Sequence, residues 1–391
     1  MKYNFDEIIE RKGTSCVKHD MMRRDFGADD LLPMWVADMD FRTPPFIMDA
    51  IRERCNHEVL GYTYADRKYY EAIIWWLDRH YNIRAEKQEL HYIPGIVSGI
   101  AFAIQAFTNR GDNILVTTPV YPPFIELPNN GGRNVISAPL YIKNGRFNIN
   151  FDILRNKIKG CKMMILSNPH NPAGTIWSAK DLAEVANICY ENDCILLSDE
   201  IHADLALFGK RHNSFSTVSE IAKNISVTFL APSKTFNIPG LASSVVYIHN
   251  DLLREKYFKY IDGYEVANGN VFAYIGATAA YTPEGEEWLE ELKRYLEGNV
   301  KYMKDFFKQK MPLVRYVSPE SSYLAWINLK QYGISHENMS NRLISIGKLA
   351  LNDGTNFGIE PNAFKGFFRL NLGCPRAVLE EGLNRLYKTF E

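Results

Sequence analysis

The chain has 391 residues, of which 45 are Lys or Arg and 46 are Asp or Glu, so its formal net charge is −1. This balance provides no overall field that would hold nucleic acid phosphates or an anionic membrane surface. Hydrophobic residues at 46% and charged residues at 23% exclude a disordered or collagen-like chain. We therefore expect a compact protein of two or three domains that binds neither nucleic acid nor membrane.

The beginning of the chain does not resemble a secretion signal, because acidic residues interrupt it and no continuous apolar stretch follows. Later apolar runs, such as residues 100–104, are far shorter than the roughly 20 residues that cross a bilayer. Six cysteines are scattered along the chain, without the dense spacing of a disulfide scaffold. Cys189 and Cys194 lack a second Cys/His pair nearby, so we predict no metal site and a cytoplasmic location.

The central part of the chain alternates short apolar runs with helical stretches. The clearest helix is predicted over Ser178–Asn192, with Ser178 as its N-cap. The alternation is typical of an α/β fold, with a mostly parallel sheet flanked by helices. Four runs that end at turn residues are predicted to be buried strands: Ile114–Thr118, Met163–Ser167, Ile195–Ser198 and Val227–Leu230.

The pattern changes after about residue 285, where a long charged segment predicts an amphipathic helix over Glu284–Lys310. Strands at Tyr323–Ile327 and Phe367–Asn371, a helix at His336–Ile346 and a final helix indicate a smaller α+β domain. We predict an N-terminal segment, 1–44, that packs with this small domain, a large domain over 45–285 and the small domain over 286–391. Because no Gly/Ser-rich linker separates the two domains, we expect an extended helix to join them.

Polar residues follow the predicted strands of the large domain: Tyr121, Asn171, Asp199 with His202, and Lys234. In parallel sheets, ligands bind beyond the carboxyl ends of the strands. Together these residues offer a lysine for a Schiff base, an acid for a pyridinium nitrogen, donors for a phenolate oxygen and an aromatic plane. This set predicts a site for pyridoxal 5′-phosphate.

Six motifs carry a resemblance that extends over nearly the whole chain. They are Leu31–Phe41, Gly61–Tyr62, Asn168–Gly174, Ser198–His202, Ser233–Gly240 and Arg369–Pro375. With them the chain resembles the fold-type I pyridoxal phosphate enzymes of the aminotransferase class I/II superfamily, and within it the MalY/PatB-type cystathionine β-lyases. The resemblance implies a large domain that binds the cofactor and a smaller α+β domain.

The resemblance also implies roles for the cofactor-binding residues. Lys234 would form the Schiff base and then move the Cα proton as a general base. Asp199 would keep the pyridine nitrogen protonated, and Tyr121 would stack on the ring. Asn171 and His202 would donate hydrogen bonds to the ring oxygen.

The phosphate would be held by backbone N–H groups of Ile96 and Val97, at the start of a helix, and by the Ser233 hydroxyl. Tyr62 is expected to reach the phosphate from a neighbouring subunit, which implies a homodimer with active sites at the subunit boundary.

Substrate contacts follow from the same resemblance. Arg369 would grip the substrate α-carboxylate with its guanidinium fork. The backbone near Ala37 and Asp38 would approach this carboxylate, and Trp35 would form a wall of the pocket.

Two departures bear on the choice of reaction. Many aminotransferases of this class have an arginine eight residues after the lysine, where this chain has Ala242, and Ser or Thr three residues before it, where this chain has Ala231. The MalY/PatB-type pattern shares the missing arginine. We therefore predict a carbon–sulfur β-lyase that cleaves cystathionine, and also cysteine or other S-conjugates, to thiol, pyruvate and ammonia. One alternative is an aminotransferase. Another is a regulatory protein that retains the fold, but the intact set of site residues weighs against this second alternative.

Overall fold

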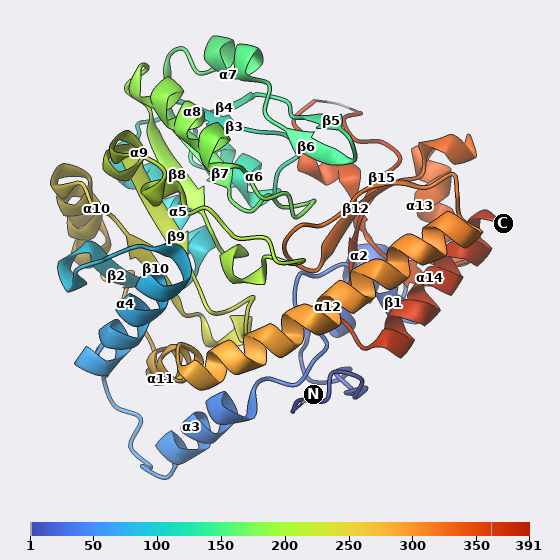
Figure 1. Cartoon of the computed structure of the whole chain (residues 1–391), viewed down its shortest axis with the longest axis horizontal. Coiled ribbons are helices and arrows are strands. Elements are labelled where there is room, and N and C mark those ends of the chain that lie inside the picture. Colours follow the sequence, from blue (N-terminus) through green and yellow to red (C-terminus); the bar gives the residue numbers. More distant parts are fainter. Residues whose placement is uncertain (1, 361) are drawn as a thin grey trace.

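A seven-stranded sheet forms the centre of the larger part of the molecule in this computed structural model, which describes residues 2–360 and 362–391 (Figure 1). The strands β4, β3, β7, β8 and β9 are parallel, whereas β10 is antiparallel to both β9 and β2. In spatial order the strands are β2 (Leu90–Ile93), β10 (Ser244–Tyr247), β9 (Ser226–Leu230), β8 (Ile195–Asp199), β7 (Cys161–Ser167), β3 (Asn113–Val116) and β4 (Asn134–Ser137).

The predicted α/β fold and its mostly parallel sheet are confirmed, and the four predicted strands are β3, β7, β8 and β9. The sequence pattern missed the edge strands β2 and β4, and also β10, which lies between β2 and β9. β10 is antiparallel because residues 231–243, which join it to β9, contain only the short η4 turn (Pro239–Leu241) rather than a crossover helix. The strand predicted to reach Thr118 ends at Val116, and the chain then turns through Pro119, which has no N–H to donate.

Helices cover both faces of this sheet, because alternate strand residues point to opposite sides. Met163 and Ile165 pack in one core with α5 and α10, whereas Met164 and Leu166 pack in another with α7 and α8. Ser178 caps α8 by accepting from the N–H of Asp181, as predicted. The helices and the hairpin around the sheet are α5 (Ile96–Phe107), α6 (Pro123–Asn130), β5 (Tyr141–Lys143), β6 (Arg146–Asn148), α7 (Phe151–Lys157), α8 (Ala179–Tyr190), α9 (Glu220–Ile225) and α10 (Asp251–Gly263).

The long helix α12 (Pro283–Lys310), orange in Figure 1, crosses the molecule from α11 to α14. It confirms the helix predicted over Glu284–Lys310. Beyond it, an antiparallel sheet has the order β11-β12-β15-β14. The elements of this part are β11 (Arg315–Val317), β12 (Leu324–Asn328), α13 (His336–Ser345), β13 (Leu349–Ala350), β14 (Asn352–Asp353), β15 (Phe367–Asn371) and α14 (Arg376–Phe390).

The N-terminal segment lies against the second sheet and then leads to the first. Its strand β1 (Leu32–Pro33) pairs in parallel with β13, so Leu32 lies opposite Leu349. Asn371 at the end of β15 donates to the carbonyls of Val36 and Asp38, at 2.6 and 2.7 Å. The helices of the N-terminal half that border this region are α1 (Val17–Asp20), α2 (Met22–Phe26), α3 (Pro45–Cys55) and α4 (Arg67–Tyr81), and α11 (Val271–Ala280) packs on the last two.

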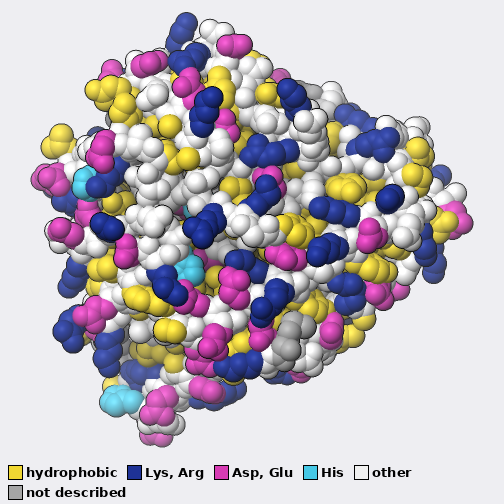
Figure 2. Space-filling view, viewed as in Figure 1, with side chains coloured by type: hydrophobic (Ala, Val, Ile, Leu, Met, Phe, Trp, Pro, Cys, Tyr) yellow, Lys and Arg dark blue, Asp and Glu magenta, His cyan; other side chains and the backbone are white. Residues whose placement is uncertain are grey.

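The surface carries charges of both signs. On the face shown in Figure 2, Lys and Arg side chains alternate with Asp and Glu over most of the molecule, as the net charge of −1 leads one to expect. Among the described helices, none is both long and apolar enough to cross a membrane.

Candidate active site

A cavity of about 180 Å³ opens at the carboxyl end of the parallel strands. β8 ends at Asp199, while Asn171, Tyr121 and Lys234 follow β7, β3 and β9. These four side chains therefore meet at one edge of the sheet, and all of them line the cavity. Its other lining residues are Ala37, Pro94, Gly95, Ile96, Val97, Ile201, His202, Ser233, Pro239, Ala242, Ser243 and Ser244.

The Lys234 amine points from the large domain toward the N-terminal segment. Its Nζ donates to the carbonyl of Ala37 at 2.6 Å, and the Tyr323 hydroxyl donates to the same oxygen at 3.0 Å. Burial lowers the pKa of Lys234 to about 8, although the negative charge of Asp38 favours the protonated form. An amine with such a pKa is partly neutral near physiological pH, so it can act as a nucleophile and as a base.

Asp199 is the acid at the opposite side of the cavity, and its side chain is only 7% exposed. Burial raises its pKa to about 7, against the hydrogen bond from the Ile201 N–H at 3.1 Å and the charge of Lys234. A carboxyl group that is costly to ionise alone is stabilised as an anion by a cationic N–H group. The site therefore suits a ligand that presents a protonated ring nitrogen to Asp199.

Two further hydrogen-bonding side chains, His202 and Asn171, line the cavity with Asp199 and Lys234. His202 is buried, and its Nδ1 lies 3.1 Å from the hydroxyl of Ser322. Burial lowers the pKa of His202 to about 3, so the ring is neutral at physiological pH. Asn171 accepts a hydrogen bond from Arg369 through Oδ1 at 2.9 Å, which leaves its Nδ2 group to act as a donor.

Arg369 is a buried cation whose contacts are neutral. It donates to Asn171 and, at 3.1 Å, to the carbonyl of Trp35, while its Nε has no partner in the part of the chain that the structure describes. Burial lowers the pKa of Arg369 to about 10, so the guanidinium keeps its charge at neutral pH. A buried charge requires a counter-ion. The position of Arg369 therefore fits an anionic ligand group such as a carboxylate.

The remaining end of the cavity carries anion-binding groups. Gly95, Ile96 and Val97 line it at the N-terminus of α5, where free N–H groups and the helix dipole favour an anion. Ser233 and Ser243 add hydroxyls, and the buried Oγ of Ser243 has no hydrogen-bond partner among residues 2–360 and 362–391. These donors fit a phosphate group.

Comparison with known proteins places this geometry in a family. Residues 29–386 match the family described as aminotransferase class I and II. The chain belongs to that family. It is 40% identical over 385 residues to the cystathionine β-lyase PatB of Bacillus subtilis, covering 98% of each chain.

Solved structures of PLP-bound proteins have the same fold as this chain. A PLP-bound putative aminotransferase from Clostridium difficile superposes with a TM-score of 0.96 at 36% identity, covering 100% of both chains. A PLP-bound C–S lyase from Staphylococcus hominis superposes with a TM-score of 0.93 at 33% identity, covering 99% of this chain and 98% of that one. The chain is accordingly a fold-type I enzyme, and its cofactor is pyridoxal 5′-phosphate (PLP).

The residues of this family member fit that cofactor. Lys234 offers the amine for the aldehyde, and Asp199 offers the acid for the ring nitrogen. The free N–H groups of α5 and the unpartnered Ser243 hydroxyl suit the phosphate. Ala242, in the position of the arginine of many aminotransferases, also lines the cavity, so hydroxyl and backbone donors would hold the phosphate instead.

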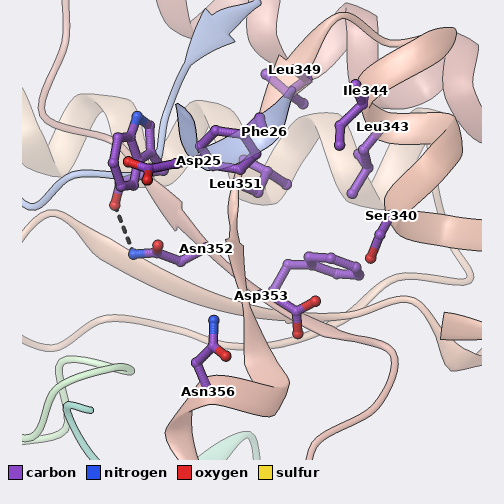
Figure 3. Close-up of a pocket in the computed structure, with 12 residues that line it drawn as sticks. Asp25, Phe26, Ser340, Leu343, Ile344, Leu349, Leu351, Asn352, Asp353 and Asn356 are labelled. Carbon is purple, nitrogen blue, oxygen red and sulfur yellow. Dashed lines mark hydrogen bonds between the residues drawn. The ribbon is translucent and has the colours of Figure 1, made fainter. Parts of the chain in front are cut away.

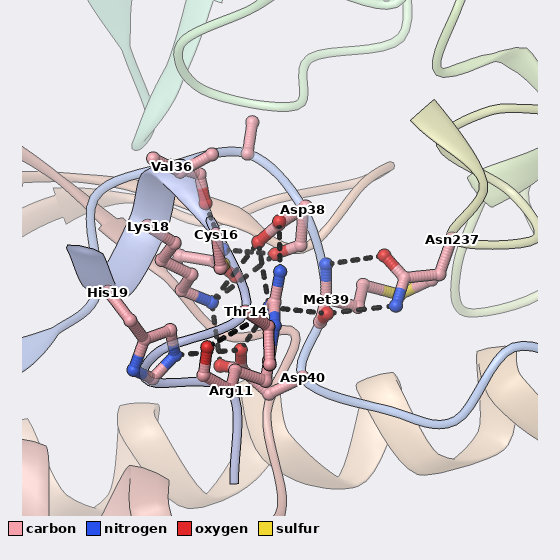
Figure 4. Close-up of polar contacts among 12 residues, drawn as sticks. Arg11, Thr14, Cys16, Lys18, His19, Val36, Asp38, Met39, Asp40 and Asn237 are labelled. Carbon is pink, nitrogen blue, oxygen red and sulfur yellow. Dashed lines mark hydrogen bonds and ion pairs between the residues drawn. The ribbon is translucent and has the colours of Figure 1, made fainter. Parts of the chain in front are cut away.

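Asp38, Trp35 and Tyr62, which were also predicted as site residues, are not among the residues that line this cavity. The Asp38 side chain turns away from the cofactor cavity and pairs with Arg11 at 2.6 Å (Figure 4). The centroid of the Trp35 ring lies 5.2 Å from that of Phe26, and Trp35 lines a separate cavity beside α13 rather than the cavity that contains Lys234. Figure 3 shows that separate cavity around Phe26 and Asn352. The indole Nε1 of Trp35 donates to the carbonyl of Lys18, which holds the ring there. Tyr62 lies on the exposed connection between α3 and α4.

Sequence reasoning missed Tyr323 and Ser243. The Ser243–Ser244 pair, next to the alanine that replaces the family's arginine, was a signal for substitute phosphate donors. Tyr323 gave no such signal, because its contact with Ala37 joins residues 286 positions apart. Within the described ranges, no cluster of three or more His, Cys, Asp or Glu side chains is arranged to hold a metal ion.

Proposed function

We propose that this PLP enzyme is a carbon–sulfur β-lyase that cleaves cystathionine to homocysteine, pyruvate and ammonia. The observation that carries the proposal is the partly neutral Lys234 amine within the same site as the buried guanidinium of Arg369. The 40% identity with the cystathionine β-lyase PatB and the superposition on a C–S lyase support the choice of reaction.

When bound, PLP withdraws electrons from the Cα of an attached amino acid and so makes the Cα proton acidic. Asp199 stabilises the positive ring nitrogen on which this effect depends. Arg369 holds the substrate carboxylate, and Lys234 removes the Cα proton. The Cβ–S bond then breaks, the thiolate takes up a proton, and water converts the remaining three-carbon unit to pyruvate and ammonia.

Transamination is the competing reaction, and the putative aminotransferase from Clostridium difficile is the observation that favours it. It shares the removal of the Cα proton by Lys234 but requires a 2-oxo acid as a second substrate. The missing arginine at Ala242 weighs against it, because the chain here departs from many aminotransferases and agrees with the lyases.

The two reactions are separated by their products. PLP-loaded protein is mixed with cystathionine alone, and pyruvate and free thiol are measured. In parallel it is mixed with alanine or aspartate plus 2-oxoglutarate, and glutamate is measured. We expect pyruvate and thiol in equal amounts without any added oxo acid. Glutamate formation without thiol release would replace the lyase by an aminotransferase.

We also propose a homodimer in which Tyr62 serves the partner's active site. The connection between α3 and α4 runs along the outside of the molecule (Figure 1). Tyr62 is fully exposed on it, with a relative exposure of 113%, and Val59, Leu60 and Tyr64 are exposed beside it. Such a run of exposed apolar side chains is typical of a protein–protein contact.

A complementation experiment tests this dimer. Lys234→Ala and Tyr62→Ala subunits are each inactive or impaired alone, and they are then co-expressed. If Tyr62 acts across the boundary, the mixed dimer has one site with both residues intact, and activity rises above that of either variant. Activity that stays at the level of the Tyr62→Ala variant, or a sedimentation profile of a monomer, would exclude the proposal.

A further inference from the structure

A second and larger cavity, of about 770 Å³, lies on the other side of Lys234. It shares Lys234 and Pro239 with the cofactor cavity. Its walls come from the N-terminal segment, from α3 and from the turn after Lys234, and Figure 4 shows the part around Arg11, Asp38 and Asn237. The lysine amine therefore stands between a small cavity that suits PLP and a larger one.

The chemistry of elimination suggests which part of the substrate the larger cavity receives. Lys234 acts at Cα, and the bond that breaks is the next one along the substrate, between Cβ and sulfur. The group attached to sulfur must therefore extend past the lysine, away from the cofactor. The second cavity is the space that begins there.

The interior of this cavity is electrically balanced. Asp40 binds Arg11 and Lys18, each at 2.6 Å, and Asp38 binds Arg11 at 2.6 Å. Although burial opposes ionisation of Asp40, the charges of Lys18 and Arg11 and the hydrogen bond from Lys18 hold its pKa well below the usual range. The remaining inner walls are mainly apolar and include Val36, Met39, Phe41 and Met48. An aliphatic chain fits between such walls.

Two exposed arginines line the cavity, and each is paired with an acid outside its lining. Arg42 and Arg52 line it with side chains that are 64% and 68% exposed. Their acidic partners, Glu7 and Asp49, are not among the residues that line this cavity. Exposed ion pairs of this kind contribute little stability, so an incoming carboxylate can replace the acid at small cost.

We propose that this leaving-group cavity binds the sulfur-side half of the substrate and selects thioethers whose leaving group is an aliphatic chain ending in a carboxylate. This inference rests on the proposed lyase function and names its substrate class. Cystathionine belongs to the class, and the amino group of its distal half is not required.

Four cysteine thioethers test the selection: S-methylcysteine, S-(4-methylpentyl)cysteine, S-(3-carboxypropyl)cysteine and cystathionine. The second and third have tails of the same shape, of which only the third is charged. We expect kcat/KM for the two carboxylate substrates to exceed that for the uncharged isostere about tenfold, as a charged hydrogen bond allows. The Arg42→Gln/Arg52→Gln double variant should lose most of this difference. Arg23→Gln, an exposed arginine outside the cavity, should keep it.

A binding measurement independent of turnover uses Cys16, a partly buried free thiol in the cavity wall. In the Lys234→Ala variant cystathionine is not consumed. We expect cystathionine to slow the alkylation of Cys16 by iodoacetamide several-fold, and S-methylcysteine to leave it unchanged. Cys55 is exposed outside this cavity and serves as the internal reference.

The outcomes distinguish this inference from the proposed function. Pyruvate production with equal kcat/KM for the charged and uncharged tails, or with a preference that survives the double variant, would overturn the cavity assignment alone. If none of the four thioethers yields pyruvate, the lyase function fails. Protection of Cys16 by cystathionine then decides whether the cavity binds such molecules at all.

Discussion

Two regions meet at Lys234, and they are built in different ways. The edge of the seven-stranded sheet places Asp199 at the end of β8, where the backbone hydrogen bonds of β7 and β9 fix it, and Lys234 lies in the turn that follows β9. The segment Val36–Phe41 has no partner strand in that sheet as described, and side chains hold it instead. The comparison teaches that the sheet positions the chemical groups, whereas side chains position the substrate-facing wall, which touches those groups through the Ala37 carbonyl.

Polar side chains from both domains hold that segment. Asn237, three residues after Lys234, accepts from the N–H of Met39 and donates to the carbonyls of Met39 and Phe41, at 2.9 to 3.0 Å. Asn371, in the small domain, donates to the carbonyls of Val36 and Asp38 in the same segment. The position of Ala37 thus depends on both domains at once, and so does the acceptor for the lysine amine.

Replacing Lys234 should give the largest effect and should affect chemistry alone. Lys234→Ala removes the base and the covalent partner, so we expect kcat for pyruvate formation to fall at least about 10³-fold. The melting temperature should not fall, because burial disfavours the lysine charge in the native state. Added methylamine should restore part of the activity. A clear fall in the melting temperature together with the fall in kcat would show that Lys234 also holds the segment Val36–Phe41 against the sheet.

Asp199 should make the stability of the cofactor-free protein depend on pH. Its pKa rises from a usual 3.8 to about 7 on folding, so the folded protein binds more protons between these values. The stabilisation is complete below pH 3.8 and is lost as the pH rises through 7, by up to about 4 kcal/mol. Lys234 acts above that window: its contribution is present above pH 10.5 and is lost as the pH falls through 8.

Urea denaturation of the wild-type protein and of Asp199→Asn, both without PLP, measures this effect. The difference between the two free energies of unfolding should change steadily between pH 4 and pH 7. A difference that is constant across this range would mean that Asp199 is ionised throughout.

The N-terminal segment should respond to Lys18, which is buried with 1% exposure. Lys18→Met removes a partner of Asp40 and leaves that carboxylate in a buried position, which costs about 3 kcal/mol of unfolding free energy. Lys12→Met, an exposed lysine in the same segment, is the control. Hydrogen exchange should accelerate in residues 11–41 while β7 and β8 stay protected. Equal acceleration in those strands would contradict the separation of the two regions.

The same division decides what the sequence could predict. The capped helix at Ser178 and the order of Asn171, Asp199 and Lys234 follow from local patterns, and these three residues line one cavity, although β3 ends two residues before the predicted Thr118. The place of the Trp35 ring could not be predicted from its own motif, because it depends on contacts with Lys18 and Phe26. The Ala37 contacts join residues 197 and 286 positions apart, and no local periodicity reports them.

Tyr323 gives the smallest effect but tests the link between the regions most directly. Its hydroxyl shares the Ala37 carbonyl with Lys234, and burial raises its pKa, so it remains a donor. In Tyr323→Phe the carbonyl accepts from Lys234 alone, which stabilises the protonated amine. The pKa of Lys234 should therefore rise above about 8, and kcat/KM at neutral pH should fall about fivefold, as expected for the loss of one hydrogen bond.

Competitive acetylation of Lys234 in the cofactor-free protein, followed over pH by mass spectrometry, measures the pKa shift without turnover. Tyr190→Phe, which removes the hydroxyl of an exposed tyrosine, is the matched control. If Tyr323→Phe lowers kcat/KM but leaves the acetylation profile in place, the hydroxyl positions the segment and does not tune the amine. If both stay unchanged, Asn237 and Asn371 are sufficient to hold Ala37, and the small domain influences the lysine only through the asparagine at the end of β15.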